Sequence, residues 1–137
     1  MAHFNKIGLL LLSKDRTKFM VCEKDNFTSD FIMPGGQLDE GENDKECLAR
    51  EIKEELNVNT DTDNLKFVGE YIDVAAGDPT KDVSIKLYEG KIIGEPKPSQ
   101  EIIKFHWINK DKSTHTRLSP IIKNKILPDL IKRKILK

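Results

Sequence analysis

The stretch Asn43–Val58 reads NDKECLAREIKEELNV and predicts an α-helix from about Asp44 to Leu56. Asn43 suits the cap of the first turn, and Glu46, three residues later, completes a capping box. Asn57 tolerates the left-handed backbone that often follows a last helical turn. An apolar residue recurs at every fourth position, which gives the helix one face to pack on a core. These apolar residues are Leu48, Ile52 and Leu56.

Another side of this helix is acidic. With about 100° of turn per residue, Glu51, Glu54 and Glu55 fall within an arc of about 100°. Like charges at these spacings destabilise a helix by roughly 0.2–0.5 kcal/mol per pair. A divalent cation would reverse that cost, because carboxylate oxygens are the ligands that Mg²⁺ and Mn²⁺ prefer. By themselves the three residues fit either a metal site or a solvated acidic face.

Arg50 flanks the acidic side, one turn after Glu46 and one turn before Glu54. This spacing fits a ladder of surface ion pairs, each worth roughly 0.3–0.5 kcal/mol. It fits equally an orienting cation that fixes the rotamers of the neighbouring carboxylates. The spacing does not separate the two interpretations.

From Gly36 through Val58 the sequence resembles the Nudix box, the signature of MutT-like Nudix hydrolases. The motif has a glycine, five residues, a glutamate, seven residues and then Arg-Glu-aliphatic-any-Glu-Glu. The matching residues are Gly36, Glu42, Arg50, Glu51, Ile52, Glu54 and Glu55. Asn57 is the single departure, since the motif has glycine there, and asparagine also tolerates a left-handed backbone.

The resemblance implies the Nudix fold, an α/β (α+β) architecture with a mixed β-sheet packed between helices, as a single domain of residues 1–137. It implies hydrolysis of a diphosphate bond in a nucleoside triphosphate or another nucleoside-diphosphate-linked substrate, with Mg²⁺ as cofactor and Mn²⁺ as a substitute. One alternative is a catalytically silent Nudix module that binds a nucleotide or a protein, although such modules commonly lose acids that this chain keeps. A second alternative is a purely structural acidic helix in an interaction protein.

The resemblance also assigns roles. It makes Glu51, Glu54 and Glu55 metal ligands, together with the backbone carbonyl of Gly35. Glu101, six residues before Trp107, is the expected carboxylate from a later loop, and it also fits a surface residue at the start of a strand.

The remaining acidic residues receive other roles. Arg50 is expected to orient the ligands and Glu51 to act as general base, with Glu101 as the alternative base. Glu42 and Glu46 are expected to be structural. Gln100 and Glu89 are alternatives to Glu101.

Apolar runs around the helix predict further elements. We expect strands at Asn5–Leu12, Lys18–Glu23, Phe31–Met33, Leu65–Val74, Asp82–Tyr88 and Ile102–Ile108. The first two should form a hairpin through Ser13–Arg16, and Pro34-Gly35-Gly36 should end the third. A loop through Gly77-Asp78-Pro79 should join the next pair. A second helix should begin at Ser119-Pro120, and Pro128 should kink or split it.

Composition narrows the class of protein. Lys and Arg number 23, as do Asp and Glu. A balanced net charge disfavours a nucleic-acid polymer or an anionic membrane as partner and leaves a small-molecule nucleotide. Cys22 and Cys47 have no metal-binding spacing and fit buried thiols in a reducing compartment. We therefore expect a cytoplasmic protein without a membrane span or signal sequence, in a family in which homodimers are common.

Markers outside the box bear on the substrate. Those of ADP-ribose, dinucleoside-polyphosphate and NADH hydrolases are missing, which favours nucleoside triphosphates by elimination. Ser119 and Asn124 are approximate counterparts of the asparagine found near the last helix in oxidised-guanine enzymes. Three aromatic residues fit either a base-stacking or a core position: Phe27, Phe31 and Tyr71. The basic residues after Ser119 fit a solvated helix face or a phosphate-binding patch.

Overall fold

The computed structural model describes residues 2–24, 30–99 and 101–137. Its largest sheet has four strands in the order β3-β1-β6-β5. β1 (Phe4–Leu10) runs parallel to β6 (Asp78–Glu89), whereas β3 (Gly35–Gln37) and β5 (Lys66–Ala75) run antiparallel to their neighbours. The sheet is therefore mixed, as the sequence predicted.

The other strands form two short pairs. β2 (Phe19–Lys24) pairs antiparallel with β8 (Ile102–Ile108), and β4 (Asn59–Thr60) pairs with β7 (Ile92–Ile93). The predicted hairpin is correct only at its turn, where Ser13 N donates to Lys18 O at 2.8 Å. Beyond the bridge between Leu12 and Phe19, β1 and β2 enter different sheets. Both are mostly buried runs, and such strands can lie inside a fold rather than as an amphipathic hairpin.

The strand predicted at Phe31–Met33 was placed too early. Phe31 and Ile32 make only isolated bridges, and β3 begins at Gly35, within the segment that was expected to end the strand. Gly35 has φ +134°, and a Cβ there would lie 2.1 Å from the carbonyl oxygen of Ile7 in β1. Glycine therefore permits the close pairing of β3 with β1 at this point. The predicted loop at Gly77-Asp78-Pro79 is also shorter than expected, because β6 begins at Asp78.

The acidic helix α1 (Asp44–Leu56) has the bounds and caps that its sequence predicted. Asn43 and Glu46 form the reciprocal capping box, and Asn57 closes the helix with φ 58° in the left-handed region. Leu48, Ile52 and Leu56 are fully buried. The apolar stripe fixes which way the helix faces and leaves its acidic side toward the cavity described below.

The C-terminal helix covers residues 120–132 and is not split at Pro128. Its middle is a π-helical segment, η3 (Ile122–Ile126), followed by α2 (Leu127–Lys132). Pro128 has no N–H to donate to the preceding turn. The Leu127 N–H donates to the carbonyl of Ile122, five residues earlier, and this wider turn carries the helix past the proline.

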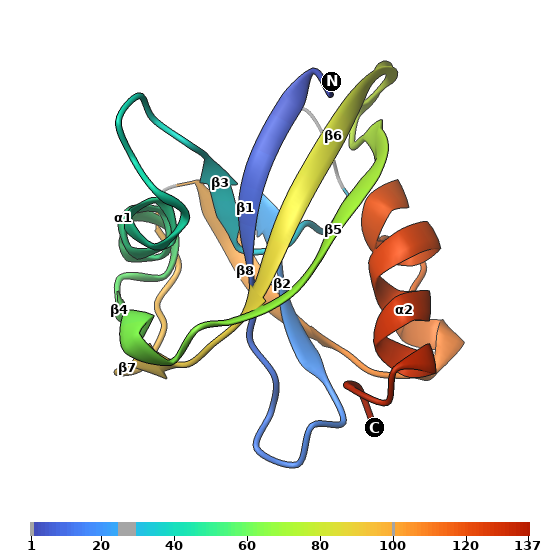
Figure 1. The fold of residues 1–137 in the computed structure, drawn as a ribbon. Helices are drawn as coiled ribbons and strands as arrows, with labels where there is room; N and C mark the ends of the chain where they lie inside the picture. Colours follow the sequence, from blue (N-terminus) through green and yellow to red (C-terminus); the bar gives the residue numbers. More distant parts are fainter. Residues whose placement is uncertain (1, 25–29, 100) are drawn as a thin grey trace.

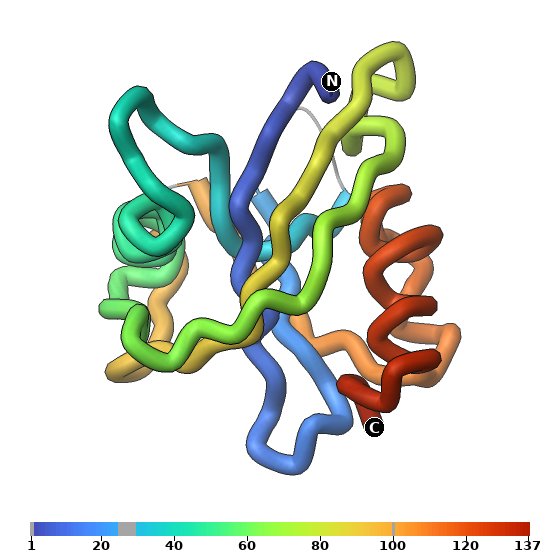
Figure 2. Tube along the Cα trace, in the orientation of Figure 1, coloured from blue at the N-terminus to red at the C-terminus, as the bar shows by residue number. Residues whose placement is uncertain are grey.

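The two helical elements lie on opposite sides of the strands (Figure 1). Successive residues of a strand point to opposite faces, and β1 shows the consequence. Ile7 and Leu9 belong to the core beneath α1, whereas Leu10 belongs to the core beneath the C-terminal helix. Figure 2 shows the chain ending beside the turn between β1 and β2, where Lys137 N donates to Arg16 O at 2.8 Å.

Among the described residues, none of the helices is both long enough and apolar enough to cross a membrane. Cys22 and Cys47 are free and buried, as expected.

Candidate metal and substrate site

Four carboxylates that the sequence singled out line one cavity of about 380 Å³. Three come from two successive turns of α1, namely Glu51, Glu54 and Glu55, and the fourth is Glu101, immediately before β8. Ser99 completes the lining. The fold thus brings Glu101 to the acidic side of α1 although about 45 residues separate them in the sequence.

Glu55 is the most buried of these acids, with 3% of its surface exposed. Gly35 N donates to its Oε1 at 2.8 Å, and the Lys24 ammonium lies 2.9 Å from its Oε2. Apart from this ion pair, Oε2 has no hydrogen-bond partner among the described residues. Burial raises the pKa of the Glu55 carboxyl, against the opposing effects of Lys24 and the Gly35 N–H. Gly35 therefore contacts the site through its amide.

Glu51 sits in a space that exists because residue 36 is glycine. A Cβ on Gly36 would lie 2.3 Å from the carboxyl carbon of Glu51 and 2.5 and 2.6 Å from its oxygens. The Glu51 side chain is 17% exposed, and Arg50 Nη1 donates to its Oε1 at 2.8 Å. The backbone of β3 therefore supports the carboxylate that the sequence assigned as base and ligand.

Arg50 makes the contacts of an orienting cation rather than those of a surface ladder. Its Nε and Nη2 donate to the two oxygens of Glu42 at 2.7 and 2.9 Å. Nη2 also donates to the carbonyl of Gln37 at 3.0 Å, and the contact with Glu54 is long, at 3.5 Å. Hydrogen bonds from Arg50 lower the pKa of Glu42 to about 2, so Glu42 is a fixed anion at neutral pH.

The other acidic candidates lie elsewhere or are more exposed. The Glu54 side chain is 59% exposed, and Glu101 is also exposed. Glu89 pairs with Arg16 at 2.9 and 3.1 Å, and Gln100 lies outside the described residues. Glu46 serves the capping box. Within residues 2–24, 30–99 and 101–137, no three His, Cys, Asp or Glu side chains already form a cluster that could hold a metal ion.

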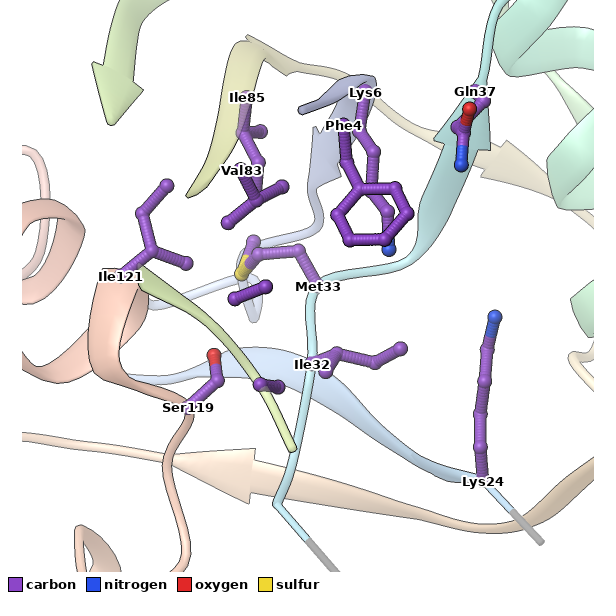
Figure 3. Close-up of a pocket in the computed structure, with 12 residues that line it drawn as sticks. Phe4, Lys6, Lys24, Ile32, Met33, Gln37, Val83, Ile85, Ser119 and Ile121 are labelled. Atoms are coloured by element: carbon purple, nitrogen blue, oxygen red, sulfur yellow. The ribbon is translucent and has the colours of Figure 1, made fainter. Parts of the chain in front are cut away.

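A second cavity, of about 280 Å³, lies between the sheets (Figure 3). Lys6, Lys24 and Gln37 line one side, and apolar side chains including Val83, Ile85 and Ile121 line the other. Lys24 links the two cavities, because it lines this one and its ammonium contacts Glu55 of the acidic one. Burial lowers the pKa of Lys6.

Sequence reasoning missed Lys6 and Lys24. The available signal was weak: each is a lysine at the end of an apolar strand segment, and such residues usually extend into solvent. Ser119 also lines this second cavity, where it is 2% exposed and its hydroxyl has no hydrogen-bond partner among the described residues.

The two aromatic candidates that the structure describes, Phe31 and Tyr71, line neither cavity. Phe31 stacks on His106 with ring centroids 4.1 Å apart, and Tyr71 donates to Asp129 Oδ2 at 2.6 Å. Phe27 lies outside the described residues. Asn124 donates to Asp73 on the outer surface at 3.2 Å. Phe4, which the sequence did not single out, is the aromatic residue among those lining the second cavity.

Comparison with protein families gives a match to the NUDIX domain over residues 3–130. The chain belongs to the Nudix family. Members of this family typically depend on divalent metals and act on nucleotide-linked substrates.

Two curated relatives are named for reactions on RNA. An RNA pyrophosphohydrolase from a Nitratiruptor species is 29% identical over 85 residues, which is 60% of this chain and 52% of that protein. The mRNA-decapping protein OPG122 of Variola virus is 62% identical over 34 residues, 25% of this chain and 14% of that protein. The matches span about half of the first relative and a seventh of the second.

Solved structures confirm the fold. The crystal structure of a MutT protein from Methanosarcina mazei Go1 matches with a TM-score of 0.74 and 19% identity, covering 96% of this chain and 95% of that one. The shared architecture is an α+β Nudix fold with a mixed sheet and two helices.

Proposed function

We propose that this protein is a Mg²⁺-dependent hydrolase that cleaves a diphosphate bond in a nucleotide-linked substrate. The observation that carries the proposal is the cavity of Glu51, Glu54, Glu55 and Glu101, which opens beside a second cavity with lysines at its edge. Mn²⁺ is expected to substitute, because hard oxygen ligands serve both ions.

The residues fit a divalent metal by their chemistry. Glu55 has a buried oxygen, Oε2, whose described partner is the Lys24 ammonium, so a cation already balances its charge. Glu51, Glu54 and Glu101 supply further carboxylate oxygens, and the Gly35 carbonyl is the proposed backbone ligand.

The reaction is a substitution at phosphorus. A water oxygen forms a bond to one phosphorus, the bridging P–O bond breaks, and the remaining phosphate leaves with that oxygen. The bound metal would neutralise the phosphate oxygens and lower the pKa of the attacking water. Glu51 is the proposed acceptor of the water proton, because Arg50 and the backbone of Gly36 fix its position. Glu101 is the alternative acceptor.

The second cavity suits the nucleoside part of the substrate. Its apolar wall matches a base, and the Ser119 hydroxyl provides a polar group that has no described protein partner. Lys6 and Lys24 stand between this wall and the glutamates, where the phosphates of the same ligand would lie. A nucleoside triphosphate is the proposed small substrate. The names of the two curated relatives lead us to propose the 5′ end of an RNA as a second substrate.

A screen for released phosphate and pyrophosphate tests the function. The substrates are nucleoside triphosphates, ADP-ribose, nucleotide sugars, dinucleoside polyphosphates and 5′-triphosphorylated RNA, each with Mg²⁺ or Mn²⁺. We expect turnover that Glu55→Gln lowers by orders of magnitude. Glu46→Gln is the matched control on the same helix, because glutamine also completes a capping box. Mg²⁺ binding without turnover of any substrate would favour a silent nucleotide-binding module.

A further inference from the structure

Although the net charge of this chain is balanced, its two parts carry net charges of opposite sign. Residues 104–137 contain ten Lys and Arg residues but only two Asp and Glu residues. Residues 1–103 contain thirteen Lys and Arg residues and twenty-one Asp and Glu residues. Most of the basic segment lies on the side of the C-terminal helix, away from α1 (Figure 1). An extended field of one sign attracts a polyanion even when the whole protein is neutral.

A groove of about 550 Å³ lies within this basic region. Lys110, Lys112, Lys123 and His115 line it, with Leu127 and Pro128 among its apolar lining residues. The three lysines are exposed. We call these four basic residues and the groove between them the basic groove.

The acidic residues nearest in sequence are already engaged. Asp111 accepts a hydrogen bond from Ser113 N at 2.9 Å and caps the short helix η2 (Lys112–Thr114). Asp129 accepts from Tyr71 and from Arg133, at 2.6 and 3.0 Å. In the part of the chain that the structure describes, no carboxylate lies within 4.0 Å of Lys110, Lys112 or Lys123. Among the described residues, the three lysines of the basic groove therefore make no ion pair.

The basic groove adjoins the proposed nucleoside cavity along the chain. Thr116 and Lys123 line the groove, while Ser119 and Ile121, between them in sequence, line the cavity. The segment 116–123 therefore contributes residues to both spaces.

We infer that the basic groove binds the phosphate backbone of a single-stranded RNA. The glutamate site would cleave the diphosphate bond at the 5′ end of the same RNA. This inference rests on the proposed function. A polymer that carries one phosphate per nucleotide matches both the terminal cavity and the extended positive surface. An acidic peptide or an anionic membrane would match only the surface. The inference departs from the expectation based on net charge, because it depends on where the charges lie.

The test compares two triple variants with equal loss of charge. The groove variant is Lys110→Gln, Lys112→Gln and Lys123→Gln. The control variant is Lys14→Gln, Lys66→Gln and Lys91→Gln, which removes three exposed lysines outside the basic region. Fluorescence anisotropy measures binding of a labelled 5′-hydroxyl RNA of about 16 nucleotides, without divalent metal, from about 50 to about 200 mM salt. Thermal unfolding confirms that both variants are folded.

We expect the groove variant to bind this RNA about tenfold more weakly at low salt, with a salt slope smaller by about 2. The control variant should bind like the wild type. Equal losses in both variants, or an unchanged slope in the groove variant, would overturn the inference. Binding of phosphatidylserine vesicles in place of RNA would also overturn it.

The outcomes separate this inference from the proposed function. The RNA probe carries no diphosphate, so its binding does not depend on catalysis. If the protein hydrolyses a mononucleotide but the groove variant binds RNA as tightly as the wild type, the proposed hydrolase function stands and the inference about the basic groove fails. If the groove variant binds RNA more weakly but the protein hydrolyses no substrate, RNA binding at the basic groove stands and the proposed hydrolase function fails.

Discussion

Arg50 holds Glu42 through two hydrogen bonds, of 2.7 and 2.9 Å, while the same guanidinium donates to Glu51 at 2.8 Å. The two carboxylates belong to different segments, the loop before α1 and the helix itself. Glu42 therefore fixes the cation that holds Glu51, and we propose that its role in catalysis is to position Glu51.

Replacement of Glu42 tests this positioning. Glu42→Gln keeps the size of the side chain and removes the anion that holds Arg50. We expect kcat to fall about 10- to 100-fold, the range found for residues that orient metal ligands, with a small change in KM. Steady-state kinetics on the substrate found in the screen measures both constants. A stability loss with unchanged kcat would show that Glu42 is only structural.

Gly36→Ala tests the space that Glu51 occupies. The added methyl group would lie within 2.3–2.6 Å of the Glu51 carboxylate and force it to move. We expect at least a tenfold loss of kcat, because small misplacements of reacting groups are costly. Gly41→Ala is the control: its Cβ meets nothing within 4 Å, but its φ of +84° strains alanine. It should lower stability by roughly 1 kcal/mol and leave kcat intact. Full activity of Gly36→Ala would contradict the assigned position of Glu51.

Glu89 gives a prediction for the dependence of stability on pH. The hydrogen bonds from Arg16 lower the pKa of Glu89 below its ordinary value of 4.5. A lowered pKa in the folded state means that the stabilisation is present at neutral pH and is lost as pH falls through that pKa. Because the pair is partly exposed, Glu89→Gln should be less stable than the wild type by roughly 0.5–1 kcal/mol at pH 7. Urea denaturation should show the difference shrinking below pH 4.5. An equal difference at pH 7 and pH 3 would refute the ion pair as its source.

Ser119→Ala separates recognition from packing. The buried hydroxyl has no described partner, so its removal should leave the free energy of unfolding unchanged or slightly higher. If the hydroxyl binds the nucleoside, KM should rise about fivefold, which corresponds to about 1 kcal/mol, a typical single hydrogen bond. Thermal unfolding and steady-state kinetics on the same preparation give both values. A less stable variant with unchanged KM would assign Ser119 to the fold.

Local signals predicted α1 well. Its caps depend on residues within three positions of each other, and its buried face follows from a spacing of four. The acidic face and its flanking arginine could therefore be assigned to one site from the sequence. The match to the Nudix box extended that assignment to Gly35 and Glu101, one of which meets the site through its amide and the other through the shared cavity.

Features that depend on distant contacts escaped the sequence. The sequence predicted that Gly35 and Gly36 end a strand. They belong to β3 instead, where the absence of side chains lets β1 and the Glu51 carboxylate approach closely. Lys24 belongs to the site because β2 places its ammonium next to Glu55. Its neighbours in sequence gave no sign of that pairing, since the two residues lie about 30 positions apart. Charge segregation likewise needed the fold to place residues 104–137 mainly on one side.

The most direct test of the account is Mn²⁺ binding, measured by the loss of the free-ion electron paramagnetic resonance signal in the absence of substrate. Three proteins suffice: the wild type, Glu55→Gln and the control Glu46→Gln. We predict that the wild type and Glu46→Gln bind Mn²⁺ equally well, and that Glu55→Gln binds at least about tenfold more weakly because it loses a carboxylate ligand. Equal binding by all three proteins, or none by the wild type, would contradict the assignment of the glutamate cavity as a metal site.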